Sequence, residues 1–216
     1  MKKLIQFSFL LLCLTVATSS FAQKKIKEGS VKFELADMGG DSPEMAMLGD
    51  TKLDFYFTKK VQRMDMNMMG GMMRIQVFTP AENPAEGTIL MDVMGMKYQI
   101  VDLTEDELIS SNSMLNTDGI EEVKYDEKDT KTVAGYLCYR ADVKMTNGMT
   151  TTYYITEKIK PPSPVKKGGK NQLKGFPLEM NIDTGQGFVM KFEAKEVNKG
   201  VEEDDVTVNA GGYIQK

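Results

Sequence analysis

Apolar and polar residues alternate with a period of two along most of the chain. Successive side chains of an extended strand point to opposite faces, so this alternation predicts strands that are apolar on one face and polar on the other. Two clear examples are the stretches 28–37 and 51–58. Their alternating apolar residues are Val31, Phe33 and Leu35 in the first stretch, and Leu53, Phe55 and Phe57 in the second.

The most distinctive stretch, Arg63–Phe78, predicts a hairpin that turns at Gly70-Gly71. A two-residue hairpin turn needs positive φ angles, which glycine adopts readily. In this register Met68 lies opposite Met73, and a shift by one residue would mix the apolar and polar sets. One face of the hairpin is then apolar and consists of Met64, Met66, Met68, Met73, Ile75 and Val77. The other face is mostly polar and consists of Arg63, Asp65, Asn67, Arg74 and Gln76, with Met69, Met72 and Phe78 at its ends.

Hairpins are also predicted on both sides of this stretch. A turn at Lys59-Lys60 would place Phe55 opposite Met64, which is a favourable pairing of sulfur and aromatic ring. The stretch 88–101 is expected to turn at Met94-Gly95. This register collects Ile89, Met91, Val93, Met96, Tyr98 and Ile100 on one face.

The second half of the chain predicts more strands of the same kind. The stretch 135–159 should form a hairpin about Asn147-Gly148, and 176–182 should pair with 188–197. A weaker strand is predicted over 120–125. The apolar face of the first strand in 135–159 is expected to hold Leu137, Tyr139, Ala141, Val143 and Met145.

Two short helices interrupt the predicted strands. Ser42-Pro43-Glu44 resembles a helix start, with a capping serine and a proline at the first helical position, and Gly49 would end this helix. A second helix is predicted over 104–115, because its first turn is rich in acidic residues that the helix dipole favours. Strands about every ten residues, with only one or two helices, favour an antiparallel sheet over alternating βαβ units.

Residues 1–22 predict a signal peptide, and residues 23–216 predict a single domain. Lys2 and Lys3 precede an apolar stretch, and Ser20-Phe21-Ala22 supplies small residues where a signal peptidase reads. The apolar stretch is short for a membrane span, and no later stretch approaches that length. We therefore expect cleavage before Gln23, a periplasmic or secreted location and no membrane-spanning segment.

The composition narrows the chemistry that the chain can perform. There is no histidine, and the net charge is −4. The absence of histidine excludes histidine general bases and the common catalytic zinc sites. No phosphate-binding loop or calcium-loop spacing is present, and an acidic chain without a concentrated basic face does not suit nucleic acid. We therefore expect neither an enzyme nor a cofactor, and no nucleic-acid partner.

Cys138 is the only cysteine after the predicted signal peptide, so no internal disulfide is expected. Its simplest interpretation is a packed strand residue, with a redox or metal role as the alternative. Strict alternation places it with Tyr136 and Arg140 on the more polar face. Either that face is also covered, or a bulge near Gly135 changes the phase of the strand.

The 18 methionines allow three interpretations. They could be ordinary core residues that fill gaps, or they could form an adaptable apolar groove that repacks around a ligand. Thioethers are also soft ligands that select Cu(I) or Ag(I). The candidate metal ligands are Met64, Met66, Met68 and Met73 on one face, and Met69 and Met72 at the tip of the hairpin. Ile75 and Val77 share that face, which favours a groove wall over a metal site.

Three stretches resemble an exported bacterial family of unknown function, the DUF4412-like family. Lys131–Ala141 carries its G-Y-x-C-x-x-A signature, Tyr153–Glu157 resembles its following aromatic-Tyr strand, and Gly175–Met180 resembles its next strand. Members of this family look like relatives of the lipoprotein carrier LolA and its receptor LolB. The resemblance implies a strongly curved antiparallel half-barrel, with one or two helices over a concave face that holds an acyl chain.

Pattern and resemblance together predict a mainly β (α+β) LolA-like protein without catalytic activity. Its expected partner is an apolar ligand, either a lipid or the acyl chain of a lipoprotein. The expected groove residues are Phe55, Phe57, Met64, Met66, Met68, Met73, Met91 and Tyr98. The alternatives are a methionine-rich Cu(I)- or Ag(I)-binding protein, and a structural or interaction protein of the cell envelope that binds no small ligand.

Overall fold

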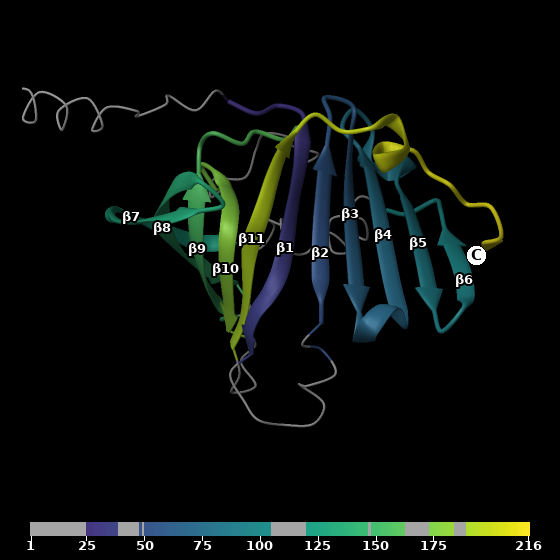
Figure 1. Ribbon diagram of the computed structural model, residues 1–216, viewed down its shortest axis with the longest axis horizontal. Coiled ribbons are helices and arrows are strands. Elements are labelled where there is room, and N and C mark those ends of the chain that lie inside the picture. Colours follow the sequence, from purple (N-terminus) through teal and green to yellow (C-terminus); the bar gives the residue numbers. More distant parts are fainter. Residues whose placement is uncertain are drawn as a thin grey trace, which may run out of the picture.

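The computed structural model describes residues 25–38, 48, 50–104, 120–146, 148–162, 173–183 and 189–216. Their strands form a 12-stranded sheet with the order β12-β6-β5-β4-β3-β2-β1-β11-β10-β9-β8-β7 (Figure 1). Neighbouring strands are antiparallel, except that β12 runs parallel to β6. The predicted mainly β fold with one curved antiparallel sheet is therefore confirmed.

The strands lie close to the predicted stretches. The strands are β1 (Gly29–Met38), β2 (Lys52–Phe57), β3 (Val61–Met68), β4 (Met73–Pro80), β5 (Thr88–Val93), β6 (Met96–Ile100), β7 (Ile120–Val133), β8 (Tyr136–Met145), β9 (Thr150–Thr156), β10 (Phe176–Asp183), β11 (Val189–Lys199) and β12 (Ile214–Gln215). The short 3₁₀ helices are η1 (Met69–Gly71), η2 (Pro84–Glu86) and η3 (Glu203–Val206). The predicted helices over 42–49 and 104–115 lie almost wholly outside the described residues.

The predicted register of the methionine hairpin is confirmed. Met68 pairs with Met73 and Arg63 pairs with Phe78, with every intermediate pair in step. Phe55 also lies opposite Met64, as the turn at Lys59-Lys60 implied. The tip differs from a two-residue glycine turn, because Met69 also adopts a positive φ angle of 56° and η1 extends the connection.

Strand β7 is longer than predicted. The sequence pattern marked 120–125, whereas the strand continues to Val133. The added part is rich in charged residues and contains a register shift against β8 between Asp126 and Thr130. Because β7 is an edge strand with largely exposed side chains, no regular alternation marks this part in the sequence.

The prediction of the apolar face of β8 is wrong for the first residues of the strand. Leu137 is 66% exposed, whereas Cys138 is fully buried. Further along the strand, Ala141 and Val143 are buried as predicted. The buried phase thus changes between Cys138 and Ala141, beside the register shift in β7. An irregular pairing of this kind moves the phase of a strand in a way that strict alternation does not foresee.

One end of the curved sheet is closed by contacts between strands that are not neighbours. The ring of Phe176 on β10 lies 6.4 Å from those of Phe33 on β1 and Phe57 on β2. Ile26, which precedes β1, forms a bridge with Ile159, which follows β9. Its amide donates to the carbonyl of Lys158 at 2.7 Å, and its carbonyl accepts from the amide of Lys160 at 2.9 Å.

Candidate functional site

Strands β3 to β6 carry a continuous apolar face that is built from cross-strand rows. Residues that lie directly opposite each other in paired strands share a face. Three rows cross the strands in order: Met64, Val77, Ile89 and Ile100; Met66, Ile75, Met91 and Tyr98; Met68, Met73, Val93 and Met96. We call these twelve residues the methionine face. Phe55 and Leu53 of β2 continue the first two rows toward the core.

Burial decreases along this face with distance from the closed end. Met64 is only 3% exposed, whereas Met66 is half-buried and packs against the buried core residues. Met68 and Met73 in the third row are also half-buried, and Met96 at the last strand is exposed. Each strand therefore has one end at the packed core and the other at a partly open methionine surface.

The eight predicted groove residues divide into two groups along this gradient. Phe55, Phe57 and Met64 belong to the buried core and lie at its end of the gradient. The remaining five are half-buried and are Met66, Met68, Met73, Met91 and Tyr98. The register brings the outer five together on adjacent strands, and they remain the predicted contact residues of a ligand.

Strands β1, β8, β10 and β11 add apolar side chains that sequence reasoning did not assign to the site. They are half-buried, pack against the core and lie at the strand ends that point away from Ile26. These residues are Leu35, Met145, Ile182 and Met190. Their strands were predicted, but no local pattern indicates which hairpins lie on either side of β1. Alternation within each strand was the only signal for them.

The opposite, polar face of β3 is covered by the C-terminal segment. Figure 1 shows this segment crossing the strands and ending beside β6. Arg63 is buried there, and its Nη1 donates to the carbonyl of Asp205 in η3 at 2.8 Å. Asp65 accepts from Nη2 of Arg63 at 2.5 Å and from Nη2 of Arg74 at 2.8 Å, and this hydrogen bond raises the pKa of the Arg74 guanidinium. The chain thus covers the polar side of β3 with its own residues.

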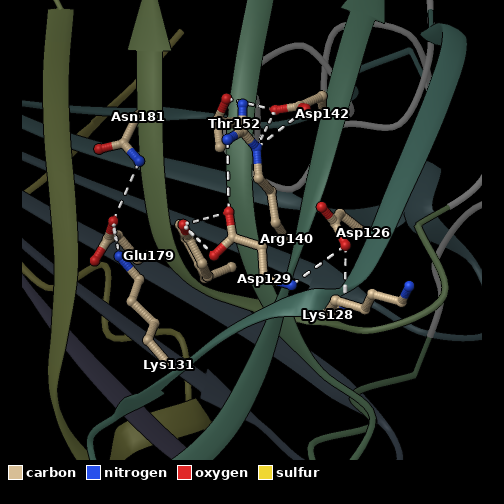
Figure 2. Close-up of polar contacts among 10 residues, drawn as sticks. Asp126, Lys128, Asp129, Lys131, Arg140, Asp142, Thr152, Glu179 and Asn181 are labelled. Atoms are coloured by element: carbon tan, nitrogen blue, oxygen red, sulfur yellow. Dashed lines mark hydrogen bonds and ion pairs between the residues drawn. The ribbon is translucent and has the colours of Figure 1, made fainter.

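A second polar network lies across β7 to β10 (Figure 2). Glu179 is buried and accepts a hydrogen bond from Lys131, and Asn181 donates to the same oxygen at 3.2 Å. Lys191 forms an ion pair with its other oxygen at 3.6 Å. The buried carboxylate is thus surrounded by two cations and an amide, and the network links the strands of this part of the sheet.

The neighbouring part of this network is built in the same way. Arg140 donates to both oxygens of Asp142 at 2.9 and 3.0 Å, and Thr152 donates to Asp142 at 2.7 Å. The hydroxyl of Tyr154 donates to Asp129 at 3.2 Å. Within the described ranges, no three His, Cys, Asp or Glu side chains are grouped so that they could hold a metal ion.

Cys138 lies in the core and is not positioned for reaction. Its thiol donates weakly to the carbonyl of Tyr136 at 3.5 Å, and burial raises the pKa of Cys138 to about 12. The thiolate is the reactive and metal-binding form of cysteine. A neutral, fully buried thiol therefore acts here as a small apolar side chain.

The family of the chain follows from a comparison with known proteins. Residues 43–210 match the family described as "Domain of unknown function (DUF4412)". The chain belongs to this family. The resemblance that the G-Y-x-C-x-x-A signature suggested is thereby confirmed, and that signature lies where β7 turns into β8. No curated protein matches this DUF4412 member.

Two solved structures show distant likeness to this DUF4412 chain. The complex of MucA and MucB from Pseudomonas aeruginosa has 12% identity and a TM-score of 0.44, and the alignment covers 85% of this chain and 55% of that chain. The lipoprotein LppX from Mycobacterium tuberculosis has 11% identity and a TM-score of 0.40, with coverage of 82% and 89%. This chain therefore spans just over half of the matched chain in the MucA/MucB complex. Likeness at this level transfers neither ligand nor partner.

The described helices are all short. In the parts of the chain that the structure describes, none is long and apolar enough to cross a membrane.

Proposed function

We propose that this DUF4412 protein is an exported, non-catalytic protein that binds an apolar ligand on the methionine face. The ligand class is a lipid or the acyl chain of a lipoprotein. The observation that carries the proposal is the contrast between the two faces of β3 to β6. The C-terminal segment covers the polar face of β3, while the second and third rows of the methionine face stay half-buried or exposed.

The shape and chemistry of the methionine face suit an elongated apolar molecule. Its rows run across four strands, and with β2 they span about four strand spacings of ~4.8 Å, or about 19 Å. Methionine is unbranched and polarizable, so a methionine surface repacks around ligands of different shape. Burial of apolar area supplies about 25 cal/mol per Å², so a long chain along these rows could be held without any polar contact.

The location of the protein is part of the same proposal. The lysines and apolar stretch of residues 1–22 support export, and the acidic chain has no histidine for catalysis. A binding protein of the cell envelope needs neither a cofactor nor a reactive group. The half-buried methionines would then meet lipids in the compartment that contains them.

Lipid analysis of the native protein tests the proposal directly. Protein purified gently from its native envelope should carry co-purifying lipid in mass spectrometry, and delipidated protein should take up a fluorescent fatty acid. Replacing Met73 and Met91 by glutamine keeps side-chain size but adds buried polar groups, and should weaken uptake at least about tenfold. Lys52→Gln, at an exposed position of β2, is the matched control and should bind normally.

Two outcomes would contradict the proposed binding of lipid on the methionine face. Repeated recovery without lipid, together with no uptake of the fatty acid, would overturn it. In that case the methionine face is covered in the working protein, and the chain is a structural or interaction protein of the envelope. Equal uptake by the glutamine variant and the wild type would place the ligand elsewhere on the sheet.

A further inference from the structure

Two turns at the end of the methionine face are joined by a backbone hydrogen bond. The turn between β3 and β4 contains Met69 and Met72, and the turn between β5 and β6 begins with Met94. The amide of Met94 donates to the carbonyl of Met72 at 2.7 Å, and the amide of Met72 donates to the carbonyl of Met69 at 3.3 Å. We call Met69, Met72 and Met94 the twin-turn methionines.

Two of these methionines adopt a backbone conformation that methionine disfavours. Met69 has a φ angle of 56° and Met94 has a φ angle of 53°. In the left-handed region a residue with a Cβ atom costs roughly 1 kcal/mol, and glycine or asparagine is the usual choice. Each turn also contains a glycine directly after its left-handed methionine, Gly70 and Gly95. Two adjacent turns therefore retain methionine where another residue would be more stable, which points to a function for the side chain.

The same side chains are unusually exposed for apolar residues. Met94 is 75% exposed and Met72 is 43% exposed, while Met69 is half-buried. Turn tips are ordinarily polar, because an exposed apolar side chain gains nothing from burial. The thioethers are thus available to solution, in contrast to Met64, which lies in the core between Phe55 and Val77.

The hydrogen-bonded turns hold the backbones of the three methionines close together. Residues whose backbones are hydrogen-bonded across a turn or between strands have Cα atoms about 5 Å apart. Three unbranched side chains on such neighbours can direct their sulfur atoms to one point without movement of the backbone. Asp92, whose Oδ1 accepts from the amide of Gly95 at 2.9 Å, adds a negative charge beside the second turn. That charge favours a bound cation.

We propose that the twin-turn methionines bind a single Cu(I) or Ag(I) ion. Thioether sulfur is a soft ligand that selects these ions over zinc and divalent copper, which prefer nitrogen ligands. The chain has no histidine to supply such nitrogen. The site is separate from the rows that would hold an apolar ligand, so it does not depend on the proposed lipid-binding function. It also places the metal on the exposed tip instead of on the four methionines that share the face with Ile75 and Val77.

Competition for Cu(I) tests the site. The purified protein should withdraw one Cu(I) ion from a chromophoric chelator under reducing, oxygen-free conditions. The triple substitution Met69→Leu, Met72→Leu and Met94→Leu keeps size and apolar character and removes all three thioethers. It should weaken Cu(I) binding by at least about 100-fold, because loss of outer-shell partners alone already costs about 10–100-fold in other metal sites. The matched control, Met66→Leu with Met68→Leu and Met73→Leu, should bind Cu(I) like the wild type.

A second measurement identifies the ligands. On titration with Ag(I), the ε-methyl NMR signals of Met69, Met72 and Met94 should shift together and saturate at one equivalent. The variant Cys138→Ala should bind Cu(I) unchanged, because its thiol is buried. Uptake of a fluorescent fatty acid should also be unchanged in the tip variant, which separates this site from the lipid-binding function.

Three results would overturn the metal site. The wild type could fail to withdraw Cu(I), the tip variant could bind as tightly as the wild type, or only the control variant could lose binding.

Discussion

The ring of Phe176 on β10 lies 5.4 Å from the ring of Phe55 on β2, although β1 and β11 separate their strands. In a flat sheet, three strand spacings would hold these side chains about 14 Å apart. The sheet therefore curls so strongly that its two arms meet through aromatic side chains at one end. This contact closes the core there, whereas the second and third rows of the methionine face, farther along the strands, are half-buried or exposed.

Removal of the Phe176 ring should destabilise the whole sheet. We expect Phe176→Ala to lower the free energy of unfolding by about 3–5 kcal/mol, because the buried ring leaves a cavity among Phe33, Phe55 and Phe57. Urea denaturation followed by circular dichroism measures this. Leu137→Ala is the control, since the exposed leucine should change stability by less than about 0.5 kcal/mol. Similar losses in both variants would contradict a core that depends on contact between the arms.

The polar network of Figure 2, in strands β7 to β10, predicts a second effect on stability. Lys131 of β7 bonds to Glu179 of β10 across the two intervening strands, and its ammonium also lies 3.6 Å from the ring centroid of Tyr154. Lys131→Met keeps the length of the side chain and removes the charge from a buried carboxylate. We expect a loss of about 2 kcal/mol in unfolding free energy, as for hydrogen bonds to charged groups.

The control for this prediction is Lys124→Met, which removes a more exposed lysine from the same strand. Its unfolding midpoint in urea should match that of the wild type, because exposed ion pairs contribute little. A double-mutant cycle with Glu179→Gln should then assign most of the loss in Lys131→Met to the pair itself. Additive effects of the two substitutions would show that the lysine contributes by packing alone.

The contrast between these contacts and the methionine hairpin explains how far the sequence predicts the structure. The pairing of Met68 with Met73 follows from local alternation and two adjacent glycines, so the register could be predicted. The contact of Phe55 with Phe176 depends on the curvature of the entire sheet, which no local pattern encodes.

Dependence on distant strands also explains why the buried face of β8 was predicted incorrectly at its start and why some site residues were missed. Leu137 is exposed because an irregular pairing with β7 changes the buried phase, and the charged stretch after Tyr125 hides that pairing from a periodicity argument. Met145 and Met190 join the partly open end only because their strands lie on the second arm of the sheet. Sequence alternation gives the face of a side chain within its strand, and the order of the strands decides what that face meets.

Cys138 gives a prediction about reactivity. Because burial raises the pKa of the thiol to about 12, the thiol should remain neutral and resist alkylation by iodoacetamide at pH 8. The test uses protein produced without residues 1–22, in which Cys138 is the only cysteine. Mass spectrometry should show modification only when urea unfolds the protein. Rapid alkylation of the folded protein would mean that the start of β8 opens readily.

The same thiol should make stability depend on pH at the alkaline end. Its pKa in the folded state lies above the ordinary value of about 8.5, so ionisation favours the unfolded chain. The stabilising effect is complete below pH ~8.5 and disappears as pH rises toward the folded pKa. Urea midpoints of the wild type should therefore fall relative to those of Cys138→Ala between pH 8 and about pH 11. A constant difference between the two proteins would contradict the raised pKa.

The ion pair beneath the C-terminal segment predicts a coupled loss of stability and coverage. Asp65 neutralises Arg63, whose guanidinium is buried, lies 5.2 Å from the ring centroid of Tyr56 and donates to the carbonyl of Asp205. Asp65→Ala leaves that cation without its carboxylate in a water-poor site. We expect about 3 kcal/mol of destabilisation, because an unpaired buried charge costs more than the pair contributes.

In Asp65→Ala, the C-terminal segment should lose protection under conditions in which the sheet remains folded. With its arginine anchor displaced toward water, the segment from Glu202 onward should exchange its amide hydrogens faster and be cut sooner by protease, while β1 and β2 remain protected. Asp37→Asn, at an exposed position of β1, is the matched control and should change neither measurement. If Asp65→Ala lowered stability but left the segment as protected as in the wild type, the covering of the polar face would depend on β12 and its pairing with β6, and not on Arg63.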